Sequence, residues 1–168
     1  MRDGVLHVGC GTPQPLGRAV APLLLVEDNP DAAELVVTSL QKSNVGNEIV
    51  VAHDGAEALD YLYATGAYSG RDTSIMPALI LLNLKLPKVG GLEVLRQVRN
   101  DPRTRLLPVV ILSSSDDEPA LRNSYELGAN SFLRKPPDPG LFADVMQHLG
   151  WYWLHLNQSP VRFPSRSS

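Results

Sequence analysis

Short apolar runs alternate along the chain with longer segments in which apolar residues recur every three to four positions. A continuous apolar run is typical of a strand buried on both faces of a parallel sheet. The helical spacing between the runs predicts five helices, as in the stripe formed by Leu92, Leu95 and Val98. Four apolar runs and a shorter fifth one predict strands: residues 23–26, 49–52, 78–82, 109–112 and 131–133.

Capping residues and helix breakers set the ends of several elements. Asp54 predicts an N-cap for the second helix, Pro119 lies in the first turn of the fourth helix, and Gly128 ends that helix. Residues 66–77 predict a polar loop that is long for a compact α/β unit. We expect an N-terminal tail, a folded unit with an extended last helix, and a C-terminal tail: residues 1–21, 22–156 and 157–168.

Strands that alternate with helices indicate a mostly parallel sheet covered on both faces. Right-handed crossovers leave few strand orders, so the sequence predicts a doubly wound, five-stranded α/β fold. Ligands of such folds bind beyond the carboxyl ends of the strands. The residues that directly follow each strand are therefore the first candidates for function.

Polar residues stand at the ends of four predicted strands. Glu27 and Asp28 follow the first strand, Asn83 follows the third, Ser113 the fourth and Lys135 the fifth. Paired acids suit a hard divalent cation such as Mg²⁺, whereas a hydroxyl and an ammonium group suit the oxygens of a phosphoryl group. Each residue alone has a simpler interpretation, as a helix cap, a turn residue or a solvated side chain. Their joint placement at matching strand ends favours one shared site.

Composition narrows the classes of partner. Hydrophobic residues make up 43% of the chain, which is enough for a core, and the net charge of −3 with scattered Lys and Arg disfavours nucleic-acid binding. The single cysteine, Cys10, excludes an internal disulfide and fits the cytoplasm. No segment approaches the roughly 18–20 apolar residues of a membrane span. We therefore expect a cytoplasmic protein without nucleic-acid or membrane partners.

Five segments of the chain resemble the signature segments of the receiver domains of bacterial response regulators. This resemblance covers roughly residues 22–150 and implies a flavodoxin-like sheet with strand order 2-1-3-4-5. The long loop before the third strand, Leu86-Pro87-Lys88 and the tryptophan-containing last helix are similar to stand-alone response regulators of bacterial phytochromes. The five segments occur in the family's order: 24–30, 79–87, 90–91, 109–115 and 135–136.

The resemblance implies a metal site. In the family, a carboxylate at the end of the third strand attacks a phosphohistidine of a sensor histidine kinase, and Mg²⁺ neutralises charge. Carried over to this sequence, Asp28 is a direct metal ligand, Glu27 orients ligands or water, and Lys85 supplies its backbone oxygen.

The resemblance also implies phosphate-binding and switch residues. Ser113 and Lys135 would hold the phosphate, and Phe132 corresponds to the aromatic ring that turns inward on activation. As in the family, we expect a cis peptide bond between Lys135 and Pro136, because the lysine must turn back toward the site.

Asn83 departs from the family pattern, because it stands at the phosphoacceptor position. A carboxamide is a very poor nucleophile, so we expect phosphorylation at this residue to fail. Loss of one carboxylate should weaken Mg²⁺ binding and relieve repulsion in the metal-free protein. Asn83 is either an engineered substitution that locks the receiver unphosphorylated or the mark of a natural pseudo-receiver. The otherwise complete site favours the engineered substitution.

The expected partners are a sensor histidine kinase, such as a bacteriophytochrome, and a second copy of the chain. We expect no DNA-binding output domain, so the output would be protein association. Trp151, Tyr152 and Trp153 are candidates for a partner surface, and we favour a homodimer through the fourth and fifth helices and the fifth strand. The alternative is that these rings pack on their own domain.

Three other functions have to be weighed against a receiver. A phosphorylation-independent adaptor fits the same residues. A metal-dependent phosphotransfer enzyme is disfavoured, because it needs a carboxylate nucleophile where Asn83 stands. A flavodoxin-like cofactor binder is disfavoured, because Glu27 and Asp28 would repel a phosphate.

Overall fold

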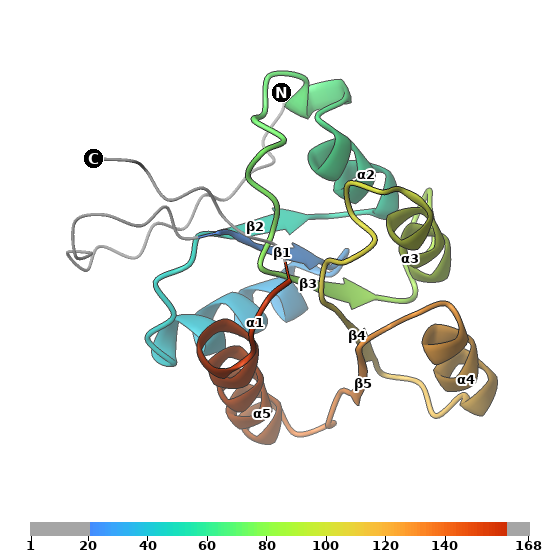
Figure 1. The fold of residues 1–168 in the computed structure, drawn as a ribbon. Helices are drawn as coiled ribbons and strands as arrows, with labels where there is room; N and C mark the ends of the chain where they lie inside the picture. The colour runs from blue at the N-terminus through green and yellow to red at the C-terminus, as the bar shows by residue number, and fades with distance from the viewer. Residues whose placement is uncertain (1–20, 161–168) are drawn as a thin grey trace.

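The computed structural model describes residues 21–160, in which five parallel strands form a sheet with helices on both faces (Figure 1). The strand order is β2-β1-β3-β4-β5, which confirms the predicted topology. Residues 1–20 and 161–168, which include most of the two predicted tails, lie outside the described residues. The strands are β1 (Leu23–Val26), β2 (Ile49–Ala52), β3 (Leu79–Asn83), β4 (Val109–Ser113) and β5 (Ser131–Arg134).

Local capping explains where several helices begin. The Asn29 side chain accepts hydrogen bonds at the start of α1, and Asp54 and Asp138 do the same for α2 and α5. None of the helices within residues 21–160 has the length and apolar character needed to cross a bilayer. The α-helices are α1 (Pro30–Lys42), α2 (Gly55–Tyr63), α3 (Gly91–Asn100), α4 (Glu118–Glu126) and α5 (Pro139–Trp151). A short 3₁₀-helix, η1 (Gly66–Tyr68), follows α2, and a π-helix, η2 (Tyr152–Leu156), extends α5.

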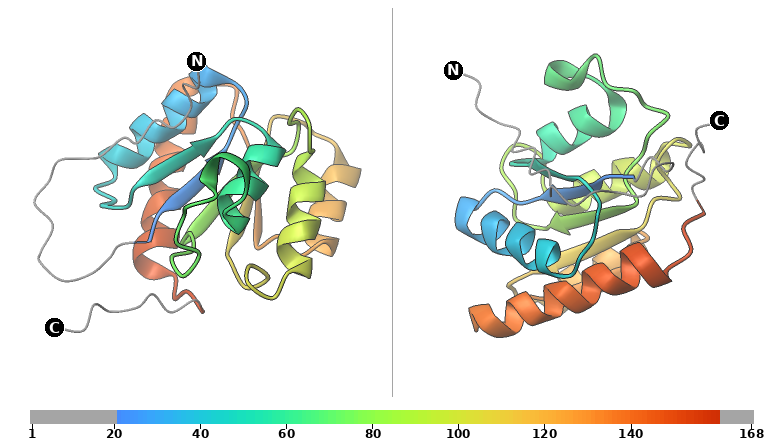
Figure 2. Two further views of the ribbon diagram at one scale, coloured as in Figure 1. Left: turned by 90° about the horizontal axis from the view of Figure 1, so that it is seen from above. Right: turned by 90° about the vertical axis from the view of Figure 1, so that its left-hand side faces the viewer.

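The strands divide their side chains between two hydrophobic clusters, because successive residues of a strand point to opposite faces. Leu24 and Val26 of β1 pack in the cluster covered by α2 and α3. Leu23 and Leu25 pack in the cluster covered by α1 and α5, which lie side by side on one face of the sheet (Figure 2). All four side chains are fully buried, and each contributes roughly 1.5–3 kcal/mol of hydrophobic stabilisation. β1 is therefore anchored in the core on both faces, and Glu27 follows directly at its carboxyl end.

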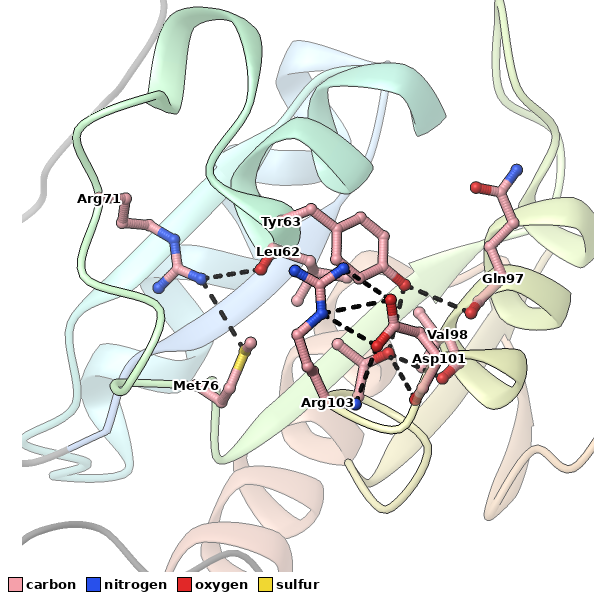
Figure 3. Close-up of polar contacts among 9 residues, drawn as sticks. Leu62, Tyr63, Arg71, Met76, Gln97, Val98, Asp101 and Arg103 are labelled. Carbon is pink, nitrogen blue, oxygen red and sulfur yellow. Dashed lines mark hydrogen bonds and ion pairs between the residues drawn. The ribbon is translucent and has the colours of Figure 1, made fainter.

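Arginine side chains fasten the loops at the amino ends of the strands. Within the long loop that precedes β3, Arg71 donates to the backbone oxygens of Leu62 (3.1 Å) and Ile75 (2.7 Å), as Figure 3 shows for Leu62. Arg103, in the loop between α3 and β4, forms an ion pair with Asp101 and stacks over the Tyr63 ring (Figure 3). The Arg71 contacts order the loop before β3, which the sequence predicts only as polar, and the Arg103 contacts fasten a second loop to α2.

Candidate functional site

The polar residues at the carboxyl ends of the strands lie around one cavity of about 290 Å³. They come from three neighbouring strands and from β5 at the sheet edge, so the topology brings together residues that are far apart in the sequence. All five side chains that the sequence analysis assigns to a shared site line this cavity: Glu27, Asp28, Asn83, Ser113 and Lys135. Lys85, whose backbone oxygen belongs to the expected metal site, also lines it.

A buried ion pair joins the two ends of the site. Lys135 Nζ lies 2.7 Å from Glu27 Oε2, and the side chains are only 16% and 2% exposed. The other carboxylate oxygen, Glu27 Oε1, accepts a hydrogen bond from the Asn29 backbone N–H at 3.1 Å. Because a buried carboxylate is costly without partners, Lys135 and the backbone N–H at the start of α1 supply the hydrogen bonds that this side chain needs.

The expected cis bond at Pro136 is wrong, since no peptide bond within residues 21–160 is cis. Lys135 nevertheless reaches the site. Its backbone N–H donates to the Ser113 carbonyl oxygen at 2.7 Å, which holds the end of β5 against β4. From there the long lysine side chain spans the remaining distance to Glu27. A turn of the backbone is therefore unnecessary.

The Asn83 side chain is oriented by three oxygen atoms. Its Nδ2 lies 3.4 Å from Glu27 Oε1, 3.4 Å from Asp28 Oδ1 and 3.3 Å from the Lys85 backbone oxygen. Two carboxylates and a carbonyl are ligands that Mg²⁺ accepts, so the donor chemistry fits a hard divalent cation. Within residues 21–160, however, no three His, Cys, Asp or Glu side chains gather as a metal site. An asparagine at position 83 is consistent with that finding.

Of the two remaining predicted residues, Ser113 lines the cavity, whereas Phe132 of β5 is not among its lining residues. Ser113 is buried, and its Oγ accepts a hydrogen bond from the Ser115 backbone N–H at 3.2 Å. Phe132 is partly buried against the cluster under α2 and α3, while its backbone N–H donates to the Tyr125 hydroxyl at 3.2 Å. The Phe132 ring therefore already rests on the core in this structure.

A contact that the sequence analysis misses fastens the loop between β3 and α3. Lys88 Nζ lies 3.0 Å from Asp54 Oδ2, which joins this loop to the start of α2. Burial would raise the pKa of the Asp54 carboxyl, but the Glu57 N–H and Lys88 outweigh burial and lower it. A Cβ atom on Gly55 would lie 1.9 Å from the Val89 backbone oxygen, so the two loops pack too closely for a side chain there. The Asp54-Gly55 pair was the available sequence signal for this contact.

The aromatic residues at the end of α5 divide between two environments. Trp151 and Tyr152 are 52% and 50% exposed. Trp153 packs against the hydrophobic cluster under α1 and α5. The structure thus leaves two of the three rings available to a partner and uses the third for its own core.

Comparison with known proteins decides the family. The sequence profile of the response regulator receiver domain matches residues 23–147, which is most of the chain. The chain belongs to the response regulator receiver family. As a receiver, it is a component of two-component signalling, and the resemblance inferred from its strand ends is confirmed at the level of the family.

Phytochrome response regulators are among the similar proteins. The receiver is 36% identical to the response regulator Rcp1 of Synechocystis over 139 residues, which cover 83% of this chain and 92% of Rcp1. The Mn²⁺-bound structure of Rcp1 superimposes with a TM-score of 0.78 at 34% identity and covers 83% of this chain and 99% of Rcp1. The structure of the phosphorylated cyanobacterial phytochrome response regulator RcpA has a TM-score of 0.79 at 35% identity, and the match covers 84% of this chain and 99% of RcpA. The bacteriophytochrome response regulator AtBRR is 49% identical and has a TM-score of 0.65, and the match covers 84% of this chain and 100% of AtBRR.

Proposed function

We propose that this receiver signals by protein binding and does not accept a phosphoryl group at the end of β3. The observation that carries the proposal is Asn83, which ends β3 beside the acid pair, where the family's nucleophilic carboxylate is expected. A carboxamide nitrogen or oxygen is too poor a nucleophile for transfer from a phosphohistidine. The same argument disfavours a metal-dependent phosphotransfer enzyme.

The neighbouring residues keep the roles of a receiver site in this proposal. Asp28, Glu27, Asn83 and the Lys85 backbone oxygen would hold Mg²⁺, which supplies charge neutralisation when bound. The Mn²⁺ in the Rcp1 structure supports a divalent cation at such a site. With aspartate at position 83, three carboxylates would balance one ammonium and one Mg²⁺. Asparagine leaves one positive charge in excess, so Mg²⁺ affinity falls.

Ser113, Lys135 and Phe132 complete the proposed machinery. Ser113 and Lys135 would contact a phosphoryl group or an anion that mimics it. In the structure Lys135 forms an ion pair with Glu27, and Ser113 is buried. Both observations are consistent with an unphosphorylated site. An engineered substitution and a natural pseudo-receiver both lead to this arrangement.

The proposed partners are a sensor histidine kinase, such as a bacteriophytochrome, and a second copy of the chain. The relatives Rcp1, RcpA and AtBRR support the first partner. The exposed apolar side chains of α4 support a homodimer through α4, β5 and α5. Within α4 only Ser124 is buried, and Leu121 and Tyr125 are 39% and 51% exposed. Sedimentation velocity over a concentration series tests the dimer, and a monomer throughout would remove it.

Beryllofluoride, which mimics a phosphoryl group on a carboxylate, tests the proposed function. In ¹⁹F NMR with Mg²⁺, the unaltered chain should show no bound fluoride signal, whereas Asn83→Asp should show one. Asn123→Asp, on the exposed face of α4, is the matched control and should show none. If neither the unaltered chain nor Asn83→Asp bound beryllofluoride, a natural pseudo-receiver would be favoured. A bound signal on the unaltered chain would contradict the proposal.

A further inference from the structure

The amino group of Asn83 lies at the point where the oxygen atoms of the acidic site converge. Glu27 Oε1, Asp28 Oδ1 and the Lys85 carbonyl oxygen all lie 3.3–3.4 Å from Asn83 Nδ2. The usual N–H···O distance is about 2.9–3.0 Å, so these contacts are long. Two amide hydrogens shared among three acceptors account for the long distances. No single acceptor captures the amino group.

These three oxygens are the same atoms that would hold a divalent cation. Magnesium binds oxygen at about 2.0–2.1 Å, and its preferred ligands are carboxylates and carbonyls. The amide hydrogens carry partial positive charge and therefore neutralise the same oxygens, only more weakly. Lys135 neutralises the second oxygen of Glu27 at 2.7 Å. Within the described residues, no buried side-chain oxygen or nitrogen lacks a hydrogen-bond partner.

We propose that the Asn83 carboxamide is a built-in substitute for the divalent cation. Its amino group holds the acid pair and the turn at residues 83–85 in place without a metal. A cation can bind only after the carboxamide rotates by half a turn, which removes the amino group and presents Oδ1 as a ligand. This inference rests on the proposed function in taking the acid pair and Lys85 as the metal-binding set.

The proposal separates two effects of an asparagine at this position. One effect is passive, since asparagine adds no negative charge beside Glu27 and Asp28. The other is active, since its amino group donates to all three oxygens. Asn83→Ala keeps the passive effect and removes the active one. Asn83→Asp removes both and adds repulsion that a cation relieves.

Thermal unfolding in EDTA and in about 10 mM Mg²⁺ tests the proposal, because a cation that binds only the folded state raises Tm. The unaltered chain should change by less than about 1 °C between the two conditions. In EDTA, Asn83→Ala should melt about 2–4 °C below the unaltered chain, and Asn83→Asp should melt lower still. Magnesium should raise the Tm of Asn83→Asp by at least about 4 °C. Asn123→Asp is the control and should behave like the unaltered chain.

The side-chain NH₂ resonances of Asn83 give a second readout, and their loss in Asn83→Ala assigns them. In EDTA these hydrogens should exchange more slowly with water than those of the exposed Asn123. Equal stability of Asn83→Ala and the unaltered chain in EDTA would overturn the proposal. So would an Mg²⁺-induced rise in Tm of the unaltered chain as large as that of Asn83→Asp. Neither readout involves a phosphoryl donor or beryllofluoride, so the proposed function is tested separately.

Discussion

The two rims of the sheet use charged side chains in opposite ways. At the amino ends of the strands, Arg71 and Arg99 donate to backbone carbonyl oxygens and so fasten the loops that precede β3, β4 and β5. At the carboxyl ends, Glu27, Asp28 and Lys135 face one another around a cavity. The arginines at the amino rim hold loops in place through hydrogen bonds to the backbone. At the carboxyl rim, the charged side chains contact one another and Asn83, and a bound cation or anion could replace these contacts. The difference separates the groups that stabilise the fold from those that serve function.

Arg99 is the strongest case at the amino rim. Burial lowers the pKa of its guanidinium group, which still stays charged. One side chain joins the loop between α3 and β4 to the turn before β5. Its acceptors lie at 2.8–3.0 Å: the carbonyl oxygens of Arg105, Leu107 and Gly128, and Asn130 Oδ1.

Loss of Arg99 should have the largest effect on stability. Arg99→Ala removes four hydrogen bonds made by a charged guanidinium group, one of them to the partly buried Leu107 carbonyl oxygen, and we expect the free energy of unfolding to fall by about 3 kcal/mol. Urea denaturation measures this change. Arg105→Ala is the control, because that side chain is exposed while its carbonyl oxygen stays in place. If both variants lost the same free energy of unfolding, the Arg99 hydrogen bonds would not be what stabilises the amino rim.

Asp54 should show a smaller, pH-dependent effect. Its lowered folded-state pKa means that ionisation favours folding above its ordinary value near 3.9, and this contribution is lost as the pH falls through the lowered pKa. Asp54→Asn should therefore cost about 0.5–1 kcal/mol at pH 7 and almost nothing near pH 2. Urea denaturation across this range measures the difference. Asp144→Asn, an exposed change on α5, should show no such dependence.

Asp28 should show the smallest effect on stability, although it lies at the candidate site. Its side chain is exposed and its contact with Asn83 Nδ2 is 3.4 Å long. Asp28→Asn should change the free energy of unfolding by less than about 0.5 kcal/mol. The same change in an Asn83→Asp background should abolish stabilisation by Mg²⁺, measured as the shift in Tm. A loss of more than about 2 kcal/mol from Asp28→Asn alone would place Asp28 among the fold-stabilising charges.

The sequence predicts the sheet well because each strand is a short apolar run with a breaker beside it. The polar residues that follow the strands were also identifiable, since parallel strands bring their carboxyl ends to one rim. Side-chain partners were not predictable in the same way. Nothing in the loop composition indicates that Arg71 donates to Leu62 and Ile75, because these bonds depend on how the loop folds back.

Two details of the site also depended on three-dimensional geometry. The cis bond at Pro136 was expected because Lys135 had to reach the acids, yet the β4–β5 pairing already places the lysine close enough. The orientation of the Asn83 carboxamide depends on three oxygens, two from the acid pair that follows β1 and one from the turn that follows β3. The residue type at position 83 therefore indicates that a carboxylate nucleophile is missing. It does not indicate which oxygens the Asn83 amino group contacts.

Asn83 should prevent phosphorylation of this receiver at residue 83. The most direct measurement is the intact mass of the unaltered chain and of Asn83→Asp after incubation with a phosphorylated sensor histidine kinase and Mg²⁺. We predict that the variant gains one phosphoryl group and that the unaltered chain gains none. A phosphoryl group on residue 83 of the unaltered chain, located by fragmentation, would contradict this prediction.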